Sequence, residues 1–157
     1  ISTLDELDPK KVSVICALGE NSTRAERYHK VVEKGFSTPS IVHPTAAISD
    51  DIKIGSGVFI NTGVIINAGA EIGENSIINT GAIIEHEVIL GKHCHLCPGV
   101  KIGGRVTIGD SAFIGIGTSV IDYVKIGSYT VIGAGSVIIG DVESHSTVVG
   151  VPGKKIK

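Results

Sequence analysis

The stretch KIGSGVFINTGVIINAGA, residues 53–70, repeats one six-residue pattern three times. Each hexapeptide has Ile at its second position, Gly or Asn at its third, and Val or Ala at its sixth. The same phase runs without an insertion through seventeen hexapeptides, from residue 41 to residue 142, and the second position is always Val, Ile or Leu. A phase kept over this length indicates an array of structural repeats.

Six residues have room for one short strand and one turn. The second and sixth positions must face a common interior because they are apolar or small, whereas Gly and Asn at third positions tolerate the positive φ angles of turns. One rung cannot bury its own apolar face, so successive rungs must stack into a solenoid. The sequence therefore predicts a mainly β protein with a solenoid of stacked strands over residues 41–157.

The first forty residues lack the repeat. KVSVICAL (11–18) is typical of a buried strand, and ENSTRAERYHKVVEKG (20–35) is typical of a helix that has Asn21 or Ser22 as N-cap and stops at Gly35. The apolar stripe of this helix is predicted to be Ala25, Tyr28, Val31 and Val32.

Residues 1–40 thus form a small α/β fragment, too short to fold well alone. We expect it to pack on a partner segment upstream or on the first coil of the solenoid. The chain starts at Ile1 and contains no Met, so we expect its natural start to lie further upstream.

Composition excludes several classes of function. The net charge is −2 and no basic block occurs outside the last four residues, which argues against a nucleic-acid partner. No apolar run approaches the length of a membrane span, and no signal peptide is visible. Three cysteines, an odd number, fit a reduced cytoplasmic setting.

The cluster GKHCHLCPGV (91–100) has the composition of a metal site, but the repeat frame divides it. Cys94 holds a sixth position and faces the interior, where it is predicted to act as a small buried hydrophobe. Cys97 holds a third position and is predicted to be a turn residue without chemistry. His93 and His95 face outward, and His93 is predicted to lie in solvent. Neighbouring strand residues point to opposite faces, so these side chains cannot converge tetrahedrally and we predict no metal.

The segment INTGAIIEHEVILGKHCHLCPGVKIGG (78–104) carries a closer resemblance. It resembles the hexapeptide-repeat sugar acetyltransferases of the sialic-acid O-acetyltransferase type. The residues that carry the resemblance are NTGAIIEHE, the histidine nine residues after the first, the following PGV and GG.V.IG, and, at the end of the chain, GVPGKKIK. This family includes bacterial nucleotide-amino-sugar N-acetyltransferases. The resemblance implies a left-handed parallel β-helix with three hexapeptides in each eighteen-residue coil.

The N-terminal residues share the resemblance. ICALGENSTRAERYHKVVEKGF (15–36) is similar to the second half of the small nucleotide-sugar domain of the family. The Gly-rich first half, where a nucleotide would be expected to bind, is not in this sequence. A nucleotide-sugar acceptor and a free sugar acceptor therefore both stay open.

By this resemblance, His86 is the general base and Glu87 raises its basicity, while Asn79 lies near the base and orients the sugar. The chemistry agrees, because acyl transfer from a thioester needs a proton removed from an incoming amine or hydroxyl, and an imidazole can do this at neutral pH. A carboxylate beside the imidazole stabilises the imidazolium that forms.

The resemblance also implies a site for acetyl-CoA, with no metal. His95 contacts the acetyl-CoA, and the backbone N–H of Gly104 meets the thioester carbonyl. The pantetheine arm follows the column of residues that begins at Pro98. Ile116 lies one coil after Pro98, and Ala134 lies one coil after Ile116.

The eighteen-residue coil predicts the assembly. His86 and Gly104 are one coil apart and should stack in one column, whereas His86 and His95 are half a coil apart, across the core. We therefore predict a homotrimer with sites between subunits. The resulting hypothesis is a cytoplasmic acetyl-CoA-dependent acetyltransferase that acts on an amine or hydroxyl of a sugar or nucleotide-sugar. The alternative is a β-helix scaffold or assembly subunit without activity.

Overall fold

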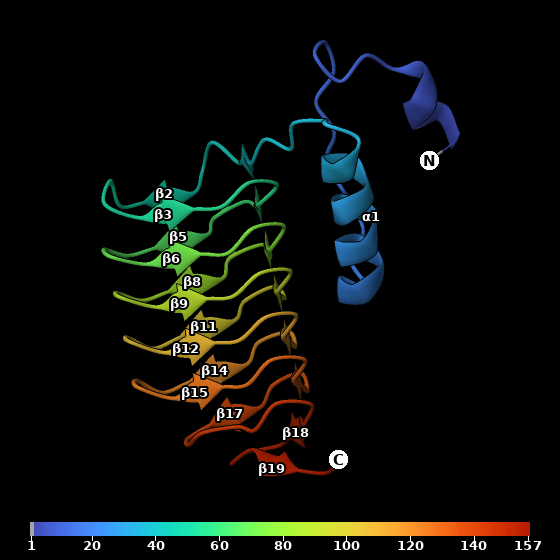
Figure 1. The fold of residues 1–157 in the computed structure, drawn as a ribbon. Helices are drawn as coiled ribbons and strands as arrows, with labels where there is room; N and C mark the ends of the chain where they lie inside the picture. Colours follow the sequence, from blue (N-terminus) through green and yellow to red (C-terminus); the bar gives the residue numbers. More distant parts are fainter. Residues whose placement is uncertain (1) are drawn as a thin grey trace.

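The computed structural model describes residues 2–157, which form a solenoid with one long helix beside it (Figure 1). In this part of the chain a short 3₁₀ helix, Ser2–Glu6, and the helix α1, Asn21–Glu33, precede nineteen strands. The strands are β1 (Ile41–Val42), β2 (Ala47–Ile48), β3 (Lys53–Ile54), β4 (Phe59–Ile60), β5 (Ile65–Ile66), β6 (Glu71–Ile72), β7 (Ile77–Ile78), β8 (Ile83–Ile84), β9 (Ile89–Leu90), β10 (His95–Leu96), β11 (Lys101–Ile102), β12 (Thr107–Ile108), β13 (Phe113–Ile114), β14 (Ser119–Val120), β15 (Lys125–Ile126), β16 (Val131–Ile132), β17 (Val137–Ile138), β18 (Thr147–Val149) and β19 (Lys154–Lys155). Within residues 2–157 no helix combines the length and the apolar composition that a membrane crossing requires.

The strands form three sheets, one on each side of the solenoid. Sheet 1 has the order β1-β4-β7-β10-β13-β16-β18-β19, sheet 2 runs from β2 to β17, and sheet 3 runs from β3 to β15. Ile41 lies opposite Phe59 and His95 lies opposite Phe113 in parallel register, so one coil takes eighteen residues. The predicted parallel β-helix is confirmed. We count coils from residue 41 and call the turn between two successive strands a corner.

The predicted interior is also confirmed. From residue 58 to residue 138 every second-position and sixth-position side chain is buried. The same positions in the first coil are less covered, because no coil stacks above them. The chain therefore has one continuous apolar core that runs along the solenoid axis.

The two cysteines of the 91–100 cluster both lie in this core. Cys94 is fully buried, as predicted, and burial raises the pKa of its thiol to about 12. Cys97 was predicted to be a turn residue, which is wrong, because its side chain packs in the core. The turn itself is formed by the next two residues, Pro98 and Gly99, and Gly99 has a φ of 69°. The residue before the turn is therefore able to point inward.

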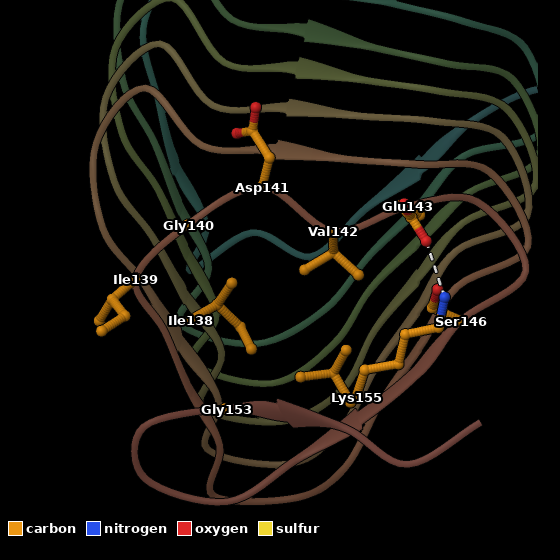
Figure 2. A pocket seen from close by; sticks show the side chains of 10 residues that line it. Ile138, Ile139, Gly140, Asp141, Val142, Glu143, Ser146, Gly153 and Lys155 are labelled. Carbon is orange, nitrogen blue, oxygen red and sulfur yellow. Dashed lines mark hydrogen bonds and ion pairs between the residues drawn. The ribbon is translucent and has the colours of Figure 1, made fainter.

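The last coil is shorter than the others. Val131 of β16 lies opposite Thr147 of β18, sixteen residues on, and β19 then pairs antiparallel with β18. Figure 2 shows the cavity of about 450 Å³ at this end of the solenoid, where the Glu143 carboxylate accepts a hydrogen bond from Lys155 Nζ at 2.7 Å. None of the predicted site residues lines this cavity.

The N-terminal residues differ from prediction in two places. Residues 11–18 do not form a buried strand; they make a single parallel bridge, between Ser13 and Ser37, and stay partly exposed. One bridge is not enough for a sheet, because no further strand lies beside this segment in the described chain. The N-cap of α1 is Glu20, not Asn21 or Ser22.

The Glu20 cap explains where α1 begins. Its carboxylate accepts hydrogen bonds from the N–H groups of Ser22 and Thr23. Hydrogen bonding by the side chain and backbone of Thr23, and then of Ser22, lowers the pKa of Glu20 to about 2. The predicted end of the helix at Gly35 is confirmed, since Gly35 follows the C-cap Lys34 with a φ of 81°.

Helix α1 lies along the corners that precede the strands of sheet 1 (Figure 1). Its N-terminal end contacts the fourth coil, where Asn21 Nδ2 donates to the carbonyl of Ser111 at 3.1 Å. Its C-terminal half contacts the first coil, where the Tyr28 hydroxyl lies 2.6 Å from Ser56 Oγ. The fragment was expected to pack on the first coil or on an upstream partner; α1 does contact the first coil, and it extends from there across four coils.

Because α1 docks in this way, both its buried face and the environment of His93 differ from the prediction. Val32, predicted in the apolar stripe, is 46% exposed, whereas Arg24 is only 1% exposed. His93 was predicted to lie in solvent, which is wrong, because α1 covers it. The ring nitrogen His93 Nδ1 lies 2.8 Å from Asn75 Nδ2, and burial lowers the pKa of the imidazole.

Candidate functional site

His86 lies at the corner between β8 and β9, just after the strand of sheet 2. Its side chain is 48% exposed, and its Nδ1 lies 3.2 Å from Oε2 of Glu87. Glu87 has a φ of 58°, so the turn conformation of the corner places the two neighbouring side chains together. This contact leaves Nε2 of His86 as the ring nitrogen open to a substrate.

Glu87 is also held by residues of the next two coils, through the same carboxylate oxygen. Its Oε2 lies 2.7 Å from Nη2 of Arg105, and Arg105 Nη1 donates to the Tyr123 hydroxyl at 2.7 Å. These three residues are eighteen apart in successive coils, and sequence reasoning missed Arg105 and Tyr123. The coil length could have found them, because residues eighteen apart stack in one column.

The electrostatics of this column keep Glu87 ionised. The hydrogen bond from His86, followed by the charge of Arg105, lowers the pKa of the Glu87 carboxyl. A lowered pKa means that the charge is present throughout the range above the ordinary value of about 4.3, and is lost only at more acidic pH. The carboxylate is therefore available to His86 at neutral pH.

Gly104 lies directly under the His86 ring, one coil further on, as predicted. A Cβ added to Gly104 would come within 2.6 Å of His86 Nε2, so only glycine allows the ring to lie there. The backbone N–H of Gly104 donates to Asp122 Oδ1 at 2.8 Å. This amide, predicted to meet the thioester carbonyl, thus already has an acceptor within the chain.

His95 lies on sheet 1 and on a different side of the solenoid from His86. Its Nδ1 lies 3.0 Å from the carbonyl oxygen of Gly19, and its Nε2 lies 3.4 Å from Nδ2 of Asn79. Burial lowers the pKa of the His95 imidazole. Asn79 was expected near the base His86, but within one chain the histidine that its side chain contacts is His95.

Two apolar cavities flank His95, between residues 15–22 and the outer face of sheet 1. One has a volume of about 580 Å³ and includes Phe113 and Tyr129 in its wall. The other has a volume of about 480 Å³ and includes Phe59 and Asn79. His95 and Gly19 line both cavities, so the hydrogen bond between these two residues separates one cavity from the other.

Pro98, Ile116 and Ala134, along which the pantetheine arm is predicted to lie, form one column of corners. The N–H of Gly117 donates to the carbonyl of Pro98 at 3.0 Å, and the N–H of Gly135 donates to that of Ile116 at 2.7 Å. Ile116 and Ala134 thus lie at equivalent corners of successive coils, and both are exposed. Over residues 2–157 no three His, Cys, Asp or Glu side chains gather as they would around a metal ion.

The repeat region matches the family model Bacterial transferase hexapeptide (six repeats) at residues 69–104 and 105–140. Hexapeptide repeats of this kind fit a left-handed parallel β-helix, the hand that the resemblance implies. A comparison with curated protein sequences found no match.

Solved structures give closer likenesses. The structure of PerB from Caulobacter crescentus in complex with CoA and GDP-perosamine is 38% identical with a TM-score of 0.97, and the match covers 99% of this chain and 76% of that chain. The acetyltransferase domain of PglB from Neisseria gonorrhoeae, also solved in complex with acetyl coenzyme A, is 30% identical with a TM-score of 0.97, again over 99% and 76%. WeeI from Acinetobacter baumannii, at 23% identity and a TM-score of 0.89 over 92% and 70%, shares the fold.

Proposed function

This chain belongs to the hexapeptide-repeat sugar acetyltransferases, and on that premise we propose that it transfers an acetyl group from acetyl-CoA to a nucleotide-linked amino-sugar. The observation that carries the proposal is the His86–Glu87 pair, half exposed and seated over Gly104. The complexes of the Caulobacter crescentus relative with CoA and GDP-perosamine support the two substrates, and two of them contain a variant with one histidine replaced.

The proposed reaction is a direct attack in a ternary complex. His86 Nε2 takes a proton from the amine or hydroxyl of the acceptor while the acceptor atom bonds to the thioester carbonyl carbon. Glu87 stabilises the imidazolium that forms. The carbon–sulfur bond then breaks, and the imidazolium returns the proton to the departing CoA thiolate. No covalent intermediate on the protein is needed, and no metal takes part.

The oxyanion of the tetrahedral intermediate needs a donor near Gly104. The Gly104 N–H can serve only if the Asp122 carboxylate shares it or moves off it, because the two are 2.8 Å apart. Acetyl-CoA on this proposal lies along the corner of Pro98, Ile116 and Ala134, with His95 as a polar contact. At the last of these residues, Ala134 lies between Gly133 and Gly135, and these small residues let the pantetheine approach the backbone.

The proposal is tested by the release of CoA thiol. We expect thiol release from acetyl-CoA with nucleotide-linked amino-sugars, slower release with the corresponding free amino-sugars, and an acetylated product of matching mass. Nucleotides without the sugar serve as the control. If no amino-sugar, free or nucleotide-linked, stimulates thiol release above this control, the enzyme hypothesis is abandoned in favour of a scaffold without activity.

We further propose a homotrimer whose sites combine His86 of one subunit with His95 of another, since the two side chains lie on different sides of one solenoid. Variants His86→Ala and His95→Ala, each inactive alone, should regain activity when unfolded and refolded together. In randomly assembled trimers roughly a quarter of the sites should be intact. A site needs His86 from one subunit and His95 from its neighbour, and half of the subunits carry each of these residues. No recovery in mixed trimers, verified by sedimentation, would show that each site lies within one chain.

A further inference from the structure

Arg24 is the one charged side chain of α1 that lies fully in the interface with the solenoid. It is 1% exposed, and a guanidinium at this depth is stable only if its N–H groups find acceptors. Its guanidinium makes six hydrogen bonds, three of them from Nη2, and all go to uncharged oxygens rather than to a carboxylate. The acceptors are the carbonyls of Asn75, Leu18, Gly19, His93 and Cys94, and Oδ1 of Asn21.

The bonds of Arg24 join three separate parts of the chain. Nε and Nη2 bind the corners of two coils at Asn75 and His93, at 2.9 and 2.7 Å. Nη1 reaches the other way, to the carbonyls of Leu18 at 3.1 Å and Gly19 at 3.3 Å. Residues 15–19 have no regular secondary structure, so these bonds fix the segment relative to the solenoid.

The Gly19 carbonyl matters because His95 is bound to it. Asn79 Oδ1 accepts hydrogen bonds from the Thr80 N–H at 2.8 Å and from Asn61 Nδ2 at 3.1 Å. The amide group of Asn79 must therefore turn its Nδ2 donor toward His95 Nε2, 3.4 Å away. A nitrogen that faces a donor must be an acceptor.

The proton of the neutral ring consequently lies on the other nitrogen. His95 Nδ1–H donates to the Gly19 carbonyl at 3.0 Å, and that oxygen has a second lone pair for Arg24 Nη1. Burial, with a smaller contribution from the Arg24 charge, lowers the pKa of the His95 imidazole and so favours the neutral form. The contacts of both ring nitrogens thus require the same tautomer, with the proton on Nδ1.

We propose that Arg24 is a positioning residue for acetyl-CoA: it fixes the Gly19 carbonyl, which holds His95 neutral with the proton on Nδ1 and Nε2 as a hydrogen-bond acceptor. The inference rests on the proposed function, in which His95 contacts acetyl-CoA. The acceptor suits an amide N–H of the pantetheine arm. The bond from Asn79 is long at 3.4 Å, which leaves the Nε2 lone pair available to a closer donor.

The binding test compares Arg24 with a second anchor of the same helix. Arg24→Met removes the bonds to Gly19, whereas Tyr28→Phe removes the hydroxyl bonded to Ser56 and leaves residues 18–19 untouched. We expect Arg24→Met to weaken CoA binding about tenfold by calorimetry and Tyr28→Phe to leave it unchanged. Arg24→Lys should be intermediate, because an ammonium lacks the planar fork. Equal weakening in both helix variants, in proportion to their thermal destabilisation, would reduce Arg24 to a structural anchor.

The tautomer test is read on the wild-type protein and does not depend on the Arg24 variants. Nitrogen spectra of ¹⁵N-labelled histidines, with His95 assigned through His95→Gln, should show a neutral ring protonated on Nδ1 at pH 7. A ring protonated on Nε2, or on both nitrogens, overturns the proposal even if Arg24→Met does not fold. Absence of acetyl transfer by the wild type would instead contradict the proposed function and leave the tautomer result to stand.

Discussion

The variant His86→Asn is expected to lose acetyl transfer by about 10³-fold in kcat, which corresponds to about 4 kcal/mol of transition-state stabilisation. The lost group is the base that accepts the proton of the attacking amine. The Asn side chain is similar in shape but cannot take up a proton at neutral pH. Stability should hardly change, since His86 is half exposed, and we expect a shift in Tm of no more than about 2 °C. Thiol release and thermal unfolding measured on one preparation check both expectations.

His145 provides the matched control. It is an exposed corner histidine, stacked on Tyr129 with ring centroids 4.9 Å apart, and it takes no part in the proposed site. His145→Asn should keep wild-type kcat. If His86→Asn retained more than about a tenth of the activity, general-base catalysis by this residue would be excluded, because such catalysis contributes at least about 10².

Gly104→Ala is expected to lower kcat by about 10²-fold while the protein folds normally. The added Cβ would meet His86 Nε2 at 2.6 Å, and the Gly104 backbone is not in the left-handed region, so alanine costs no backbone strain. The half-exposed His86 ring can move away at little cost in folding free energy. That movement displaces the base from the acceptor, and a displacement of about 1 Å is sufficient for a loss of this size. Steady-state kinetics and thermal unfolding separate the two effects.

Two further glycines make this experiment decisive. A Cβ on Gly103 would lie 2.7 Å from the backbone nitrogen of Asp122, so Gly103→Ala should lower Tm by about 4 to 8 °C. Gly140 has no heavy atom within 4 Å of its added Cβ, so Gly140→Ala should leave both Tm and kcat unchanged. A Gly104→Ala enzyme with full kcat would show that the ring position over Gly104 is not the catalytic one.

The solenoid could be predicted from sequence because its determinants are local. A second-position residue such as Ile84 is buried by the same position one coil away, so the pattern of one hexapeptide repeats in all. The burial of Cys94 followed from this frame. Cys97 did not, because the frame assigns the turn to a third position, whereas the chain turns one residue later at Pro98.

The surroundings of α1 could not be predicted because they depend on contacts between distant residues. His93 faces outward from its coil, as the frame requires, yet Arg24, sixty-nine residues earlier, binds its carbonyl and the helix covers its ring. An arginine in the first turn of a surface helix is ordinarily assigned to solvent. The local sequence around Arg24 gives no indication that backbone carbonyls of distant residues will accept its hydrogen bonds.

The candidate site is intermediate between these cases. The stacking of His86 over Gly104 followed from the coil length alone, and the same arithmetic predicts the column of Glu87 and Arg105. The bond between the Gly104 N–H and Asp122 Oδ1 did not follow, because eighteen-residue spacing says which residues are neighbours and not which atoms bond.

The span of α1 across four coils has a consequence for the order of folding. Coils of a solenoid can form one after another, each on its neighbour, but the partners of α1 lie as far apart as Ser56 and Ser111. The helix therefore gains its full set of contacts only after the first four coils have stacked. Contacts of such long sequence separation form late. Because the Gly19 carbonyl arrives at His95 with the helix, the completed solenoid has His86, Glu87 and Gly104 in place but lacks the contact that orients His95, and docking of α1 is the step that adds it.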